Sequence, residues 1–337
     1  MTALSHAPRR RGFNLPEMFL GPDDLRWADM IRGPRGCFRE IDFEWIAGWG
    51  FNFVRLPLSY RWWAKVEAPF TIEESGLAPL DAAVEWTQRH GLRLGLCLHH
   101  APGFVINPLP QPDPFDLWQD DEALACFVHH WRTLARRYAG VSAAVLEFNL
   151  VNEPVRCTAT QYERVVRAAV AAIREVSPKR CIIADGIDAG TTPVPGLTPL
   201  GVTQGCRGYW PHEVTHHLAW WAGEPTARPD WPMTLTDGTE ANVETLRARF
   251  APWRALAVSG GSVFCGELGA WHRTSHAVFL RWLADLFAVL REFECGWALW
   301  NFRGSFGVLD STRSDVVYED WHGCPLDRAL LNLLQKS

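Results

Sequence analysis

Short apolar runs alternate with amphipathic helical patterns along nearly the whole chain. Eight runs have the length of β-strands, at residues 12–14, 51–57, 92–99, 145–152, 181–185, 201–209, 262–267 and 296–302. Helical patterns fall near residues 40–49, 79–90, 120–138, 159–176, 239–257, 275–292 and 325–335. Segment 186–200 is rich in Gly and Pro and gives only a weak helix signal. Such alternation is typical of β/α units that share one sheet.

The strand-like runs are apolar throughout rather than at every second residue. This pattern is typical of strands buried on both faces, as in a parallel sheet covered by helices. Eight β/α units without a linker-like break predict a single (β/α)8 TIM barrel, with a doubly wound open sheet as the structural alternative. We expect residues 1–337 to form one catalytic domain, with a flexible segment at 1–11.

Long loops follow four of the predicted strands. They lie at residues 15–39, 100–119, 211–238 and 303–324. Loops of this length in a compact domain usually carry function. Because barrel enzymes place their active sites at the carboxyl ends of the strands, we expect the functional residues there.

Two of the predicted strands deliver a glutamate to their carboxyl ends. One run ends in Asn152-Glu153-Pro154 and another in Gly266-Glu267. Two carboxyl groups are what hydrolysis of a glycosidic bond requires, and a separation of about 5–5.5 Å goes with retention of configuration. Asn152 supplies an amide that can bind the sugar 2-hydroxyl group. Alone, the Asn-Glu-Pro triplet is equally a strand-ending turn.

Tryptophan is unusually frequent, with 18 Trp against only 5 Tyr. Many of these Trp stand beside Pro, Gly or charged residues, where a flat apolar ring suits a sugar ring. At any single position, packing in the core is an equal alternative. The composition therefore agrees with a carbohydrate substrate.

Neither a nucleic acid nor a membrane is an expected partner. The formal net charge is -5, whereas both partners call for a basic face. Residues 1–11 contain no apolar signal segment and no run approaches the about 18 apolar residues of a membrane span, so we expect a cytoplasmic location. Most of the nine Cys lie in apolar runs without C-x-x-C spacing, which favours reduced, buried thiols. The sequence predicts no oligomeric state.

Five motifs in order resemble glycoside hydrolase family 5, the cellulase and β-mannanase family of retaining (β/α)8 glycosidases. They lie at residues 49–57, 98–103, 152–154, 266–269, and 297–302 with 304–311. The resemblance reaches from about residue 12 to residue 334. Five motifs in the family's order are far more specific than any one of them.

The resemblance implies a role for each matching residue. Glu153 corresponds to the general acid/base, Glu267 to the nucleophile and Asn152 to the 2-hydroxyl ligand. Trp300 corresponds to the platform under the sugar at the cleavage point. Arg55 would hold Glu267 ionised, and His99 corresponds to an active-site histidine. A structural salt bridge for Arg55 and a core position for His99 are the alternatives.

The sequence departs from the family pattern at one position. Where the family usually has His-x-Tyr, this chain has Arg207-Gly208-Tyr209. Tyr209 matches the tyrosine that bonds the nucleophile, and Arg207 replaces the histidine. A fixed cation there is expected to alter substrate contacts, the proton network around Glu267, or both.

A zinc-protease signature, H-E-x-x-H, follows at once and competes with this interpretation. It consists of His212, Glu213 and His216, but Glu224 and Glu240 offer no recognised spacing for a third ligand. In the barrel these residues belong to a loop beside the site. Trp210, His216 and Trp271 are further candidates for sugar contacts.

The sequence therefore predicts an enzyme of carbohydrate metabolism that hydrolyses β-linked oligosaccharides or a glycoconjugate with retention, without metal or cofactor. We expect short chains as substrates, since Trp-rich loops can wall a pocket. Gluco- and manno-configured substrates, and exo and endo action, remain alternatives. Besides the zinc hydrolase, a non-catalytic carbohydrate-binding barrel is possible, with tryptophan platforms at Trp210, Trp220, Trp221, Trp231, Trp271 and Trp300.

Overall fold

Eight parallel strands close into a barrel in the computed structural model, which describes residues 9–24, 30–107, 109–223 and 228–337. The strands are β1 (Arg11–Asn14), β2 (Phe53–Ser59), β3 (Arg93–Ala101), β5 (Leu146–Asn149), β6 (Cys181–Asp185), β7 (Thr203–Gly208), β10 (Ser262–Leu268) and β11 (Gly296–Leu299). Strand β1 pairs with both β2 and β11, and β2 also pairs with β3. The predicted (β/α)8 barrel is thus confirmed, and the open sheet is wrong.

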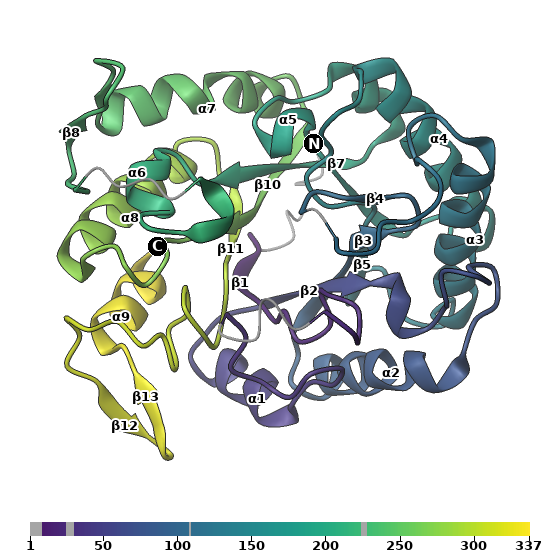
Figure 1. Ribbon diagram of the computed structural model, residues 1–337, viewed down its shortest axis with the longest axis horizontal. Helices are drawn as coiled ribbons and strands as arrows, with labels where there is room; N and C mark the ends of the chain where they lie inside the picture. Colours follow the sequence, from purple (N-terminus) through teal and green to yellow (C-terminus); the bar gives the residue numbers. More distant parts are fainter. Residues whose placement is uncertain (1–8, 25–29, 108, 224–227) are drawn as a thin grey trace, which may run out of the picture.

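Helices form a ring around these strands (Figure 1). They are α1 (Glu40–Gly48), α2 (Glu74–Arg89), α3 (Asp121–Arg137), α4 (Ala159–Val176), α7 (Val243–Val258), α8 (His276–Arg291) and α9 (Arg328–Lys336). Capping boxes begin two of them, with Thr158 and Gln161 at α4 and Asn242 and Thr245 at α7. Helix α2 begins before the predicted 79–90 segment. Of the helix residues before 79, only Leu77 is buried, so no apolar stripe predicts this part of the helix.

Segment 186–200, whose helix signal is weak, contains no full helix. It forms the short turn α5 (Ile187–Gly190) and a 3-10 helix at Pro195–Leu200. Asp188 and Ala189 have positive φ angles of 56° and 58°, which interrupts regular helix. The segment therefore lies as a folded loop at the carboxyl end of β6.

Smaller elements decorate the same barrel. They are β4 (Phe104–Val105), α6 (His212–Thr215), β8 (Met233–Thr234), β9 (Glu240–Ala241), β12 (Glu319–Trp321), β13 (Cys324–Leu326) and 3-10 turns at Tyr60–Trp62 and Trp220–Ala222. Strand β4 turns back and pairs antiparallel with the end of β3, and β12 and β13 form a hairpin that projects from the ring (Figure 1).

The barrel interior is filled by side chains from four of the strands, β2, β6, β10 and β11. Phe53 of β2 and Phe264 of β10 meet edge to face at 5.1 Å and cluster with Ile183 and Ala298. Side chains that fill the interior in this way make a barrel of this kind a packed core rather than a pore. The functional groups therefore have to lie above this layer, at one end of the barrel.

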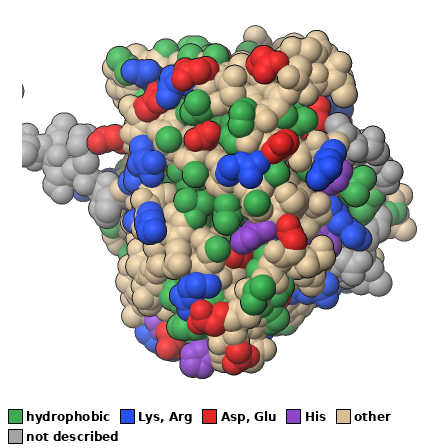
Figure 2. All heavy atoms as spheres, turned by 90° about the vertical axis from the view of Figure 1, so that its left-hand side faces the viewer, with side chains coloured by type: hydrophobic (Ala, Val, Ile, Leu, Met, Phe, Trp, Pro, Cys, Tyr) green, Lys and Arg blue, Asp and Glu red, His purple; other side chains and the backbone are tan. Residues whose placement is uncertain are grey.

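Several expectations from composition can be compared with the structure. All nine Cys are free, and five of them are buried. None of the described helices is long and apolar enough to cross a membrane. On the face that carries α8 and the β12–β13 hairpin, charges of both signs are interspersed (Figure 2). Of the segment predicted to be flexible, residues 1–8 lie outside the described residues.

Candidate active site

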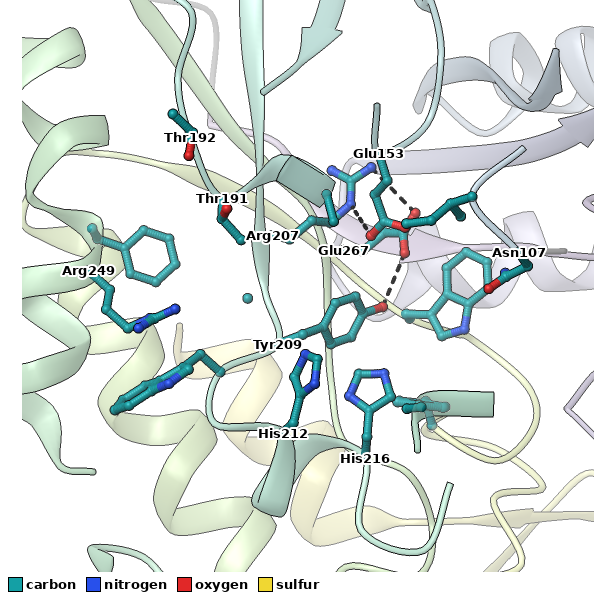
Figure 3. A pocket seen from close by; sticks show the side chains of 18 of the residues that line it. Asn107, Glu153, Thr191, Thr192, Arg207, Tyr209, His212, His216, Arg249 and Glu267 are labelled. Carbon is teal, nitrogen blue, oxygen red and sulfur yellow. Dashed lines mark hydrogen bonds and ion pairs between the residues drawn. The ribbon is translucent and has the colours of Figure 1, made fainter. Parts of the chain in front are cut away.

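Glu153 and Glu267 line one cavity of about 570 Å³ at the carboxyl ends of the barrel strands. Glu267 belongs to β10, and Glu153 follows the end of β5. The side chain of Arg207 lies between them: its Nε is 3.0 Å from Glu153 Oε1, and its Nη2 is 3.6 Å from Glu267 Oε1 (Figure 3). The structure therefore brings together the two carboxyl groups that the sequence singled out.

A β-bulge directs Glu267 toward the cavity. In the pairing of β10 with β7, Cys265 is opposite Cys206 but Glu267 is opposite Arg207, so that Gly266 is the extra residue. A Cβ atom on Gly266 would lie 2.9 Å from Arg207 Nη1. Only glycine leaves room for the guanidinium at this point.

Glu267 is held by two donors. Arg55 Nη1 lies 2.6 Å from Glu267 Oε1, and the Tyr209 hydroxyl donates to Oε2 at 3.2 Å. Arg55 is fully buried and also donates to Asn14, Asn149 and Asn152. A permanent cation and a hydroxyl donor both favour the ionised carboxylate. Arg55 is thus a buried ion-pair partner whose position is fixed by three strands.

Glu153 is in the opposite electrostatic situation. Burial, together with the nearby charge of Glu267, raises the pKa of the Glu153 carboxyl to about 7, although Arg207 opposes the shift. Asn152 Nδ2 donates to Glu153 Oε2 at 3.1 Å. A carboxyl group that holds its proton near neutral pH beside one bonded to Arg55 and Tyr209 is the division required of an acid and a nucleophile.

Asp185, at the end of β6, was not predicted as a site residue. Its carboxylate accepts hydrogen bonds from Arg207 Nη2 and from Asn149 Nδ2 at 3.1 Å. It also accepts one from the backbone N–H of Glu153 at 3.1 Å, where Glu153 has a positive φ of 47°. The sequence does contain a sign that Asp185 belongs to the site, because the run 181–185 ends in a carboxylate, as the two glutamate runs do.

The Asp185 and Arg207 side chains form a fully buried ion pair beside Glu153. A Cβ atom at position 205 would lie 2.2 Å from Asp185 Oδ1, so Gly205 is required for this arrangement. Arg207 Nη2 also donates to Asn152 Oδ1 at 2.8 Å. The arginine that departs from the family pattern thus contacts both carboxyl groups and has its own counterion.

His99 and Trp300 form another part of the cavity wall. Their rings are stacked at 5.6 Å, and Phe19 packs edge to face against both. Burial, reinforced by Arg55 and Arg207, holds the pKa of His99 well below its usual value, so the ring is neutral. Its Nδ1 is buried without a hydrogen-bond partner among the described residues. His99 therefore lines the cavity as a neutral ring whose Nδ1 is shielded from it.

The loop after β7 supplies aromatic side chains to the cavity. Trp210, His216 and Trp221 line it. Trp271 does not line it but packs behind Trp221, with ring centroids 4.7 Å apart. Trp231 lies in the core, where its Nε1 donates to Asp285 at 2.9 Å, so it is no sugar platform.

The H-E-x-x-H residues lie beside the two glutamates rather than in a separate site. Helix α6 spans only His212–Thr215, and the rings of His212 and His216 are 4.9 Å apart. His216 Nδ1 is bonded to the Thr215 hydroxyl at 2.9 Å. Within the described part of the chain, no three His, Cys, Asp or Glu residues are grouped as metal ligands. Glu224 lies outside the described residues.

Comparisons with known proteins agree with this geometry. Residues 40–305 match the family described as cellulase, glycosyl hydrolase family 5. Endoglucanase C of Acetivibrio thermocellus is 26% identical over 307 residues, covering 83% of this chain and 88% of that protein. Cellodextrinase A of Ruminococcus flavefaciens is 27% identical, covering 77% of each chain. A crystal structure of a glycoside hydrolase matches with a TM-score of 0.90 at 34% identity, covering 97% of this chain and 99% of that one.

Proposed function

The chain belongs to glycoside hydrolase family 5 and is a β-glycosidase, and from this premise we propose that it cleaves β-linked glucan oligosaccharides with retention of configuration. Two of its relatives are named endoglucanase and cellodextrinase, which supports a β-glucan substrate. The observation that carries the proposal is the pair Glu153 and Glu267 in one cavity, where Arg207 contacts both carboxyl groups and Arg55 and Tyr209 bond only to Glu267.

Each carboxyl group has one role in the proposed mechanism. The Glu267 carboxylate attacks the anomeric carbon and forms a glycosyl ester, while Glu153 gives its proton to the departing glycosidic oxygen. Glu153, now ionised, takes a proton from water as that water attacks the anomeric carbon and releases Glu267. Arg55 and Tyr209 favour the first step because they hold the Glu267 carboxyl group in position.

The surrounding residues bind and orient the sugar in this proposal. Asn152 Nδ2 reaches Glu153 with one hydrogen and keeps the other for the 2-hydroxyl group. Trp300 is the platform under the ring that is attacked, and the neutral His99 ring lines the cavity beside it. Trp210 and His216 supply further contacts. Trp271 affects sugar binding only indirectly, because it packs against Trp221 and does not contact the ligand.

Short chains are the proposed substrates. The side of the cavity that holds Trp300 is lined by an aromatic and apolar cluster that includes Phe19, Met30, Phe306 and Trp221. A wall of this kind fits the end of a chain better than the middle of a polymer. We propose one catalytic domain, without metal or cofactor; a cytoplasmic location stays a prediction.

Substitution of each glutamate tests the assignment. With an aryl β-cellobioside as substrate, Glu267→Gln is expected to lose activity by at least about 10³-fold, because no nucleophile remains. Glu153→Gln is expected to keep more activity on an aryl glycoside with an acidic phenol than on cellotriose, since a good leaving group needs less protonation. Product configuration is followed by NMR.

Glu213→Gln is the matched control, because Glu213 is the glutamate of the competing zinc signature. Glycosidase chemistry through Glu153 and Glu267 predicts that this variant and a chelator leave kcat unchanged. Activity lost in Glu213→Gln but kept in both other variants would overturn the proposal in favour of the zinc hydrolase. Absence of turnover with every β-glucan and β-mannan oligosaccharide would support a carbohydrate-binding barrel.

A further inference from the structure

The cavity extends beyond the two glutamates into a second arm. This arm lies between the folded loop after β6, which carries Thr191 and Thr192, and helix α7, which carries Arg249 and Phe250. Figure 3 shows Arg249 across the gap from the two threonines and away from Glu153 and Glu267. None of these four residues has a role in the proposed mechanism.

Arg249 is a cation without a counterion. It forms no ion pair with any described residue, whereas its helix neighbours Arg247 and Arg254 both pair with Glu292, at 2.7 and 3.7 Å. Among the described residues that line the cavity, the acidic ones are Glu153 and Glu267, which already contact Arg207. The positive charge of the arm is therefore not balanced by the protein around it.

The guanidinium of Arg249 is also held in position. It stacks over the Trp210 ring, 4.8 Å from the ring centroid, and the Trp210 carbonyl accepts a 2.9 Å hydrogen bond from Trp282 Nε1. Stacking on an aromatic face fixes the plane of a guanidinium but leaves its N–H edge for a ligand. Across the gap from Arg249, Thr192 also lines the arm, and its hydroxyl is a second polar group for the same ligand (Figure 3).

The position of the arm indicates which part of a substrate enters it. In the proposed function, Trp300 and His99 hold the sugar that is attacked, on the side of the cavity that the apolar cluster of Phe19, Met30 and Phe306 lines. The other arm then receives the leaving part of the substrate. Resting on that function, we propose that Arg249, stacked on Trp210, is a specificity residue that binds an acidic group, such as a sugar carboxylate, on the leaving side.

A matched pair of substrates tests this proposal. Cello-oligosaccharides of three to five units are oxidised at the reducing end to aldonates or reduced there to alditols, so that they differ in a carboxylate against an alcohol. We expect kcat/KM of the wild-type protein to favour the aldonate by about fivefold at one or more chain lengths, as for a partly exposed charge pair. The preference is expected to shrink as salt is added.

Two variants locate the effect. Arg249→Gln is expected to reduce the aldonate-to-alditol ratio to about one. Arg247→Gln removes the same charge from the same helix outside the cavity and is expected to keep the wild-type ratio. A wild-type ratio of one at every length, or a preference that persists in Arg249→Gln, would overturn the proposal. If alditols are cleaved, these outcomes leave the proposed function intact.

Failure of the proposed function has a different signature, since neither aldonate nor alditol would then be cleaved. In that case calorimetric affinities of the wild-type protein and Arg249→Gln for the same pair decide the role of Arg249. Tighter binding of the aldonate that is lost in Arg249→Gln supports it. Equal affinities overturn it.

Discussion

At the scale of single residues, Arg207 is the position where this chain differs most from its family pattern. An arginine brings a fixed charge to a place where the family usually has a titratable ring. The structure balances this charge with Asp185, which also accepts from the backbone N–H of Glu153. The pair therefore adds no net charge beside the two glutamates, yet each partner acts on the pKa of Glu153.

Substitution of the two partners should move the pH profile in opposite directions. Asp185 raises and Arg207 lowers the pKa of Glu153, which lies at about 7. The proposed acid works only when protonated, so activity falls as the pH rises through this pKa. We expect Asp185→Asn to move the alkaline limb of kcat/KM down by about 1 pH unit and Arg207→Gln to move it up.

The measurement is kcat/KM on an aryl cellobioside from pH 5 to 9, below the melting temperature of each variant. Both variants break a buried pair and will be less stable, so melting curves are recorded in parallel. Opposite shifts of the alkaline limb cannot come from lost stability alone. If the alkaline limb moved in the same direction in both variants, the ion pair would not set the pKa of Glu153.

At the scale of elements, the loop after β7 decides the shape of the cavity. Its 3-10 turn, Trp220–Ala222, presents Trp221 to the cavity, and Trp271 supports Trp221 from behind. Trp220, next in sequence, is 51% exposed and does not line the cavity. Two adjacent tryptophans of one turn thus have different surroundings.

We expect Trp221→Ala to weaken the preference for short chains. Removing this ring opens the wall around the attacked sugar, so kcat/KM for cellotriose should fall by about fivefold or more relative to a soluble β-glucan polymer. Trp220→Ala is the matched control and should keep the wild-type ratio. Equal cleavage of trimer and polymer by the wild-type protein would contradict a pocket for short chains.

At the scale of the whole molecule, the two ends of the barrel have separate tasks. The cavity lies at the carboxyl ends of the strands. Away from it, Glu147 of β5 is fully buried and pairs with Arg93 of β3 and with Arg10, which precedes β1. This cluster joins strands from distant parts of the sequence, and polar groups at the amino-terminal end of a barrel typically serve stability.

Glu147→Gln should therefore destabilise the fold without changing the chemistry. Breaking a buried ion pair from one side costs about 3–5 kcal/mol, because two arginines lose their counterion. We expect a lower midpoint of denaturant unfolding and an unchanged kcat well below the melting temperature. A loss of kcat in fully folded protein would show that the two ends are coupled.

Much of the architecture could be predicted from local patterns. Apolar runs such as 181–185 and 262–267 are buried on both sides, so their composition already predicts parallel strands. Segment 186–200 failed to form a helix for the reason visible in its Gly and Pro content. The start of α2 was missed, since its first turns carry no apolar stripe.

The sequence by itself determined the barrel, the family and the two glutamates, because each depends on residues adjacent along the chain. Only the tertiary structure decided which residues surround these glutamates. Asp185 and Arg207 meet through neighbouring strands β6 and β7, and Trp210 and Arg249 through a loop and a helix. Such contacts depend on strand register, a bulge at Gly266 and loop paths, which no local periodicity encodes.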